Sequence, residues 1–146
     1  MSDINRATFT APLSIAGSTP EGLQLRGAAH KRVWDRAVMF QLEVAPSARK
    51  ANAFYRVEWR PFSPHTNSGS GPPELRFLVI NGSHEHLLDD NCVESEDRLR
   101  AGNLGTARPL ESEPGTYEAL LEFVARQLNI HDMFRVPVPP WSGDLF

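Results

Sequence analysis

The sequence is poor in cysteine and has no long apolar run. Cys92 is the only cysteine among 146 residues, so no disulfide can form within the chain, and a single thiol is typical of proteins in a reducing compartment. No apolar stretch approaches the roughly 18 residues that a membrane-spanning helix requires. The first residues lack the basic start and apolar core of a signal peptide. We therefore predict a soluble cytoplasmic protein with no membrane contact.

The sequence also lacks a dominant charge and the short motifs of common enzyme classes. The formal net charge is −3, which excludes an overall basic field of the kind that attracts nucleic acid. There is no glycine-rich phosphate loop, no GxSxG, no HExxH and no cysteine pair. Positive charge is concentrated between residues 26 and 60. We interpret it as an ordinary solvated surface, with a surface for an anionic ligand as the alternative, and we predict no cofactor and no metal.

Hydrophobic periodicity divides the chain into several strands followed by one helix. Apolar and polar side chains alternate over 38–44 and 54–60, and a nearly continuous apolar run over 75–80 is typical of a central strand. We expect 75–80 to pair with 54–60, and residues 84–88 to form a further short strand. Residues 1–30 are predicted to hold two shorter, irregular strands.

The strongest helix signal lies near the C-terminus. Thr116 is a good N-cap, and the apolar residues that follow it at helical spacing form one stripe, which ends at Asn129. Residues 132–146 are rich in proline and contain Trp141, so we expect an extended tail that docks on the body or on a partner. Strands followed by a helix predict a single α+β domain over 1–146, with an antiparallel sheet of about five strands and the amphipathic helix on one face.

Three of the five histidines, His65, His84 and His86, are the candidate site residues. His84 and His86 are two residues apart, so in a strand both imidazoles project from one face. Together with His65 they could hold a zinc ion, with a carboxylate supplied by Asp89 or Asp90.

Two other interpretations of the histidines are open. They could cleave RNA without a metal, one acting as base and one as acid, with Arg56 or Arg60 holding the phosphate. The interpretation that we favour is structural: His65 hydrogen-bonds within its proline-rich loop, and His84 and His86 face solvent on an edge strand.

Three motifs carry a resemblance to a known family. They are the loop Pro64-His65-Thr66-Asn67, the segment His84-Glu85-His86, and a C-terminal helix that ends at Asn129-Ile130. With these motifs in this order, residues 54–131 resemble a family of small proteins of bacterial and mobile-element genomes. More distantly, the chain is similar to TumE-like toxins, which are partners in toxin–antitoxin pairs. The resemblance implies that the site positions are His65, Asn67, His84 and His86.

These observations predict a small cytoplasmic protein that binds another macromolecule in a defence, counter-defence or toxin–antitoxin context. We expect a protein partner, with RNA as a further candidate. The residues expected to contact the partner or a phosphate are Arg56, Arg60, Asn67 and Trp141. The first alternative is a nuclease or phosphodiesterase that uses the three histidines, with or without a metal. The second is an oligomerising structural module, a homo-oligomer whose tail docks on a neighbouring subunit.

Overall fold

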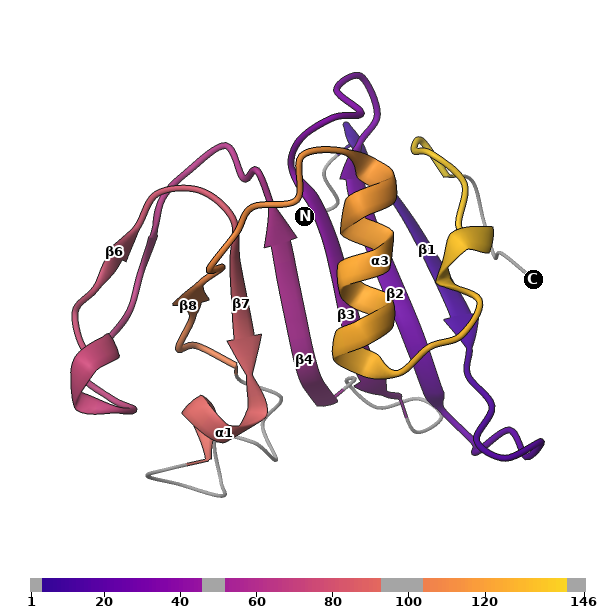
Figure 1. The fold of residues 1–146 in the computed structure, drawn as a ribbon, viewed down its shortest axis with the longest axis horizontal. Coiled ribbons are helices and arrows are strands. Elements are labelled where there is room, and N and C mark those ends of the chain that lie inside the picture. The colour runs from indigo at the N-terminus through magenta and orange to yellow at the C-terminus, as the bar shows by residue number, and fades with distance from the viewer. Residues whose placement is uncertain (1–3, 46–51, 93–103, 142–146) are drawn as a thin grey trace.

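Figure 1 shows a computed structural model of the chain, which describes residues 4–45, 52–92 and 104–141. Within these residues the main sheet has six strands, each antiparallel to its neighbours, in the order β1-β2-β3-β4-β7-β8. Their bounds are Arg6–Pro12 (β1), Leu23–His30 (β2), Val38–Val44 (β3), Asn52–Trp59 (β4), His84–Leu87 (β7) and Arg108–Pro109 (β8). Helix α3, Tyr117–Leu128, lies across one face of the sheet. The predicted α+β fold is confirmed.

The core lies between the sheet and α3. Strand alternation sends one set of side chains toward the helix, among them Phe9, Phe40 and Val57, each at most 2% exposed. The stripe of α3 meets them with Leu120 and Val124, which are fully buried. Removal of these apolar groups from water is the main force that holds the helix on the sheet.

Local signals set both ends of α3. The Thr116 hydroxyl accepts a hydrogen bond from the Ala119 N–H (3.1 Å), as an N-cap does. Asn129 ends the helix in the left-handed conformation, with φ 53°. The helix therefore begins and ends where the sequence predicted.

The segment after α3 docks on the body of the same chain. It forms a short 3-10 helix, Met133–Arg135 (η2), and returns toward β1 (Figure 1). The Trp141 ring packs edge-on against Phe9, with ring centres 4.7 Å apart, and its Nε1 donates to the Pro137 carbonyl (2.8 Å). Trp141 is therefore a core residue. Residues 142–146, the remainder of the expected tail, lie outside the described residues.

A second sheet lies beyond β8, at the end of the main sheet remote from β1 (Figure 1). It consists of two short strands, β5 (His65–Thr66) and β6 (Val79–Ile80). After β6 the chain enters β7, which is followed directly by the short helix α1, Leu88–Asn91.

The prediction of one strand over 75–80 paired with 54–60 is wrong. Pro73–Leu75 is a 3-10 helix (η1), and Phe77 has a left-handed backbone with φ 59°. Proline at the start of η1 supplies the helical φ, and the left-handed residue interrupts the extended run, so only Val79–Ile80 are strand. The strand that pairs with β4 on the side opposite β3 is β7 instead.

The face of the main sheet opposite α3 carries the polar side chains. The strand register aligns two rows of residues there, Arg26, Gln41, Arg56 and His86 in one row and Ala28, Met39, Glu58 and His84 in the next. Facing residues of adjacent strands are within side-chain contact, so β4 sets Arg56 beside His86 and Glu58 beside His84. None of the helices in the described part of the chain has the length and apolarity needed to cross a membrane.

Candidate functional site

Strand β7 carries His84 and His86 on the face opposite α3. They are 0% and 2% exposed, and β7 lies between β4 and β8. The favoured interpretation, solvent-facing histidines on an edge strand, is therefore wrong. Glu85, between them, points to the other face, where its Oε2 accepts hydrogen bonds from the Tyr55 hydroxyl (2.9 Å) and from Gln127 of α3 (2.8 Å). Glu85 is not part of the histidine cluster.

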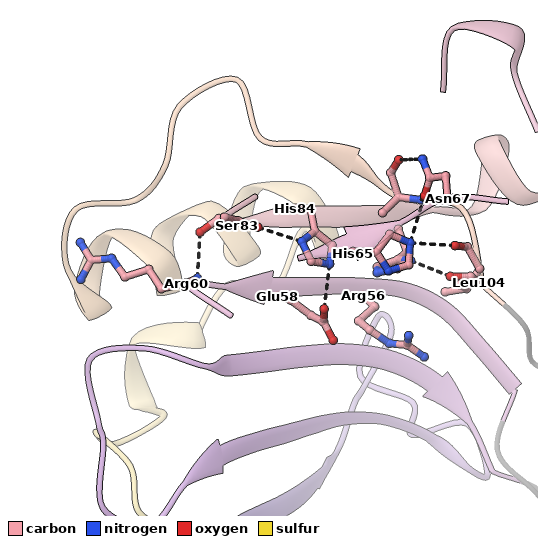
Figure 2. A network of polar contacts seen from close by, with 12 residues as sticks. Arg56, Glu58, Arg60, His65, Asn67, Ser83, His84 and Leu104 are labelled. Atoms are coloured by element: carbon pink, nitrogen blue, oxygen red, sulfur yellow. Dashed lines mark hydrogen bonds and ion pairs between the residues drawn. The ribbon is translucent and has the colours of Figure 1, made fainter. Parts of the chain in front are cut away.

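Strand β5 brings His65 onto the same cluster (Figure 2). The ring centres of His65 and His84 are 5.2 Å apart, those of His65 and His86 5.1 Å, and those of His84 and His86 5.2 Å. One nitrogen from each ring lies within 4.8 Å of the other two. The three histidines thus join the small sheet to the main sheet.

Asn67 holds His65 in position. Its side chain is almost fully buried and its Nδ2 donates to the carbonyls of Leu75 (2.9 Å) and Ala107 (2.8 Å). Its Oδ1 accepts from the Ala107 N–H (2.8 Å), which fixes the orientation of the amide. The same oxygen lies 3.0 Å from His65 Nε2, and the Gly105 carbonyl oxygen lies 3.0 Å from that nitrogen as well.

The hydrogen bonds decide which nitrogen of each ring carries the proton. His65 Nε2 faces two acceptors, so it is the donor. His84 Nδ1 donates to the Gly82 carbonyl (2.9 Å), and His86 Nδ1 donates to the Leu104 carbonyl (2.6 Å). In the neutral rings the lone pairs therefore lie on Nδ1 of His65 and on Nε2 of the other two. Within the described residues neither of those buried Nε2 atoms has a hydrogen-bond partner.

The separations of the ring centres are compatible with three imidazoles around one tetrahedral metal ion, although the nitrogens, within 4.8 Å of one another, would have to approach to about 3.3 Å to bind it. With a zinc–nitrogen distance of about 2.0–2.1 Å, each ring centre lies about 3.2 Å from the metal, and two rings at the tetrahedral angle have centres about 5.2 Å apart. The three observed separations are 5.2, 5.1 and 5.2 Å. Metal-bound histidines almost always donate their other N–H to an oxygen, and all three rings do so here.

Glu58 of β4 adds a carboxylate to the cluster (Figure 2). Its Oε2 lies 2.7 Å from His84 Nε2, and the two groups form an ion pair when the ring is protonated. A carboxylate and an unprotonated imidazole nitrogen repel at this distance unless a cation, either a proton or a metal ion, is present. The contact with His84 lowers the pKa of Glu58 to about 2, against burial, which raises it. Burial lowers the pKa of His84, but Glu58 and the Gly82 carbonyl outweigh it and the pKa lies above its usual value.

His86 stays neutral. Burial lowers its pKa to about 3, and the positive charge of Arg56 acts in the same direction. The Arg56 guanidinium is held on the sheet because its Nε donates to Gln41 Oε1 (2.8 Å). His86 Nε2 is therefore available as a ligand at neutral pH.

Not every residue predicted for the site lies at the cluster. Arg60 follows the end of β4 with a left-handed backbone (φ 49°), and its guanidinium turns away to the carbonyls of Asp35 (3.2 Å) and Gly115 (3.0 Å) (Figure 2). Asp90 is buried and forms an ion pair with Arg108 (2.9 Å), so its carboxylate does not join the histidines as a metal ligand.

Trp141 lies in the core on the α3 side of the sheet, and Asp89 is exposed on α1. Glu58 is the site residue that the sequence analysis missed. The polar alternation over 54–60 contained it, but its partnership with His84 depends on the pairing of β4 with β7. That pairing has no local signal in the sequence.

Comparison of the chain with protein-family models, with curated proteins and with solved structures gave no match. The resemblance to small mobile-element proteins and to TumE-like toxins therefore stays a prediction. The fold and the site define a small α+β protein with a cluster of three histidines, two of them buried, and one partly exposed carboxylate.

Proposed function

We propose that this chain is a metal-binding protein in which His65, His84 and His86 hold one zinc ion and Glu58 takes the fourth position. The observation that carries the proposal is that three imidazole rings each bring one nitrogen within 4.8 Å of the other two, while a second nitrogen of each ring lies at hydrogen-bond distance from a backbone carbonyl. Three imidazoles and one carboxylate are a set of donor groups that zinc prefers. The residues present therefore fit the ion.

The proposed ion has a structural role. Its ligands come from β4, β5 and β7, so it ties the small sheet to the main sheet. Four protein ligands leave no open position, which is typical of structural zinc. The burial of His84 and His86 supports this role, because a substrate could not reach either ring.

With its two sheets joined by the proposed zinc ion, the protein would act by binding another macromolecule. A metal site closed by four protein ligands supplies rigidity rather than chemistry, and this supports a binding protein over a hydrolase. The defence, counter-defence or toxin–antitoxin context and the cytoplasmic location belong to the proposal as predictions from the sequence.

A metal-independent phosphodiesterase is the second candidate function. The observation that favours it is that the pKa of His84 is raised while that of His86 is lowered. Such divergence is what a general acid and a general base require. Arg56 could bind the phosphate from the same row of the sheet. The burial of both rings opposes this candidate.

Metal analysis of the chain purified without a histidine tag tests the proposal. We expect stoichiometric zinc in the wild type and its loss in the His84→Ala, His86→Ala double variant. The control is His131→Ala, because His131 is exposed and lies outside the cluster. A wild-type chain that takes up no zinc, or a double variant that keeps it, contradicts the metal proposal. Cleavage of a phosphodiester by the zinc-free wild type but not by the double variant would favour the second candidate.

A further inference from the structure

A basic and aromatic surface lies at the end of the sheet where β2 passes into β3. The residues of this stacking surface are Lys31, Arg32, Trp34, Arg36 and Phe62. The antiparallel order places the end of β4 beside the start of β3, so the segment that leaves β4 reaches the β2–β3 connection (Figure 1). Phe62 belongs to that segment.

Two aromatic rings of the stacking surface are open to solvent. Trp34 is 53% exposed and Phe62 56%. Both are held in place: Trp34 Nε1 donates to the Lys31 carbonyl (2.9 Å), and the Arg36 guanidinium lies 5.4 Å from the centre of the Phe62 ring. His30 approaches Phe62 edge-on, with ring centres 5.8 Å apart. Ordered rings that contribute so little to the core are suited to contact a ligand.

Positive charge surrounds these rings although the chain as a whole is acidic. Lys31, Arg32 and Arg36 are exposed in the turn, where Asp35 is the one acidic residue. Arg6 lies next to the surface, because it lines a pocket of about 180 Å³ together with Phe62. Glu58 lines the same pocket and is the acidic residue of its wall.

We propose that the stacking surface binds single-stranded nucleic acid. Bases stack on Trp34 and Phe62, and phosphates contact Lys31, Arg32 and Arg36. Stacking platforms combined with a line of cations are how proteins bind single strands without reading their sequence. The pocket is smaller than the roughly 300 Å³ at which drug-sized sites begin, so it admits one small group beside Phe62. The proposal goes beyond metal binding, because none of these residues belongs to the histidine cluster.

Fluorescence anisotropy with labelled single strands of about 12 nucleotides, oligo(U) and oligo(dT), tests this inference. We expect Trp34→Ala and Phe62→Ala each to weaken binding by about 5-fold to 150-fold. With three phosphate contacts at about 0.7 each, the logarithm of the affinity should fall with the logarithm of the salt concentration with a slope of about −2, and Arg36→Ala should reduce the steepness of that slope by about 0.7. Trp34→Phe should keep most of the affinity, since a ring remains.

Matched control variants test whether any exposed ring or any exposed cation would give the same effect as the residues of the stacking surface. Phe134→Ala removes a ring that is 76% exposed on η2, and Arg126→Ala removes an exposed cation on α3, and neither should change the affinity. Circular dichroism melting of each variant verifies that it folds. Three outcomes would overturn the inference. The first is that the wild type binds neither strand at low salt. The second is that the Trp34→Ala and Phe62→Ala variants fold and bind like the wild type. The third is that polyglutamate binds as tightly as the strands do, with an affinity that does not change in the Trp34 and Phe62 variants. The last would identify an acidic protein as the partner.

Discussion

Zinc added to the metal-free chain should raise its melting temperature, and His84→Ala should abolish the rise. The ligands come from β4, β5 and β7 and converge only in the folded chain. Zinc therefore binds the folded state in preference to the unfolded state and stabilises it by mass action. At a free zinc concentration of 100 times Kd, the free energy of unfolding rises by about 2.7 kcal/mol.

The expected shift follows from the size of the chain. For a domain near 146 residues, 1 kcal/mol corresponds to about 2–4 °C in Tm. Saturating zinc should therefore raise Tm by about 5–11 °C. Differential scanning calorimetry of the chain after treatment with EDTA and dialysis, with and without zinc, measures it.

The variant is compared with itself, with and without zinc, because His84→Ala also removes the ion pair with Glu58 and lowers the stability of the metal-free chain. His131→Ala is the matched control and should keep the full shift. Magnesium should give no shift, since it prefers oxygen ligands. An equal zinc shift in His84→Ala and the wild type would refute the reasoning, because the metal would then bind elsewhere.

Three further predictions concern the residues around the cluster and the tail. Asn67→Ala leaves several buried groups unpaired and should lower the free energy of unfolding by about 3 kcal/mol and the zinc affinity by about 10–100-fold through loss of the His65 contact. Urea titration and zinc competition measure the two effects, and unchanged values would contradict the role assigned to Asn67. As the pH falls from about 6.5 to about 5, the free energy of unfolding of the metal-free chain should fall by up to about 1.4 kcal/mol per pH unit. The reason is that His86 takes up a proton in the unfolded chain but not in the folded chain, where its pKa is depressed. The raised pKa of His84 changes stability only above about pH 6.5. His86→Gln should therefore remove the pH dependence of the free energy of unfolding between about pH 6.5 and pH 5. A wild-type chain whose stability does not change over this range would contradict the prediction. Trp141→Ala should lower the free energy of unfolding by about 3–5 kcal/mol with no change of mass in light scattering, whereas a change of mass at unchanged stability would mean that the tail docks on a neighbouring subunit.

Local patterns in the sequence predicted the parts of the fold that depend on near neighbours. The period-two alternation over 38–44 and 54–60 identified β3 and β4, and the cap at Thr116 located the start of α3. The two-residue spacing of His84 and His86 also predicted correctly that both rings share one face.

The remainder depends on pairing between distant segments, which composition and periodicity do not encode. The apolar run over 75–80 has the pattern of a central strand, yet only Val79–Ile80 is extended and it pairs with β5. The exposure of His84 and His86 was predicted wrongly because β5 and the Leu104 and Gly105 segment cover them, and these contacts span long stretches of sequence. The position of Glu58 in the site was also missed, because it depends on the pairing of β4 with β7.

A crystal structure of the zinc-loaded chain, with anomalous diffraction recorded at the zinc edge, tests the central claim most directly. The account predicts one anomalous peak about 2.0–2.1 Å from His65 Nδ1, His84 Nε2 and His86 Nε2, with a Glu58 oxygen as the fourth ligand. A peak elsewhere, or three imidazoles that keep their separation with no metal between them in saturating zinc, would contradict it.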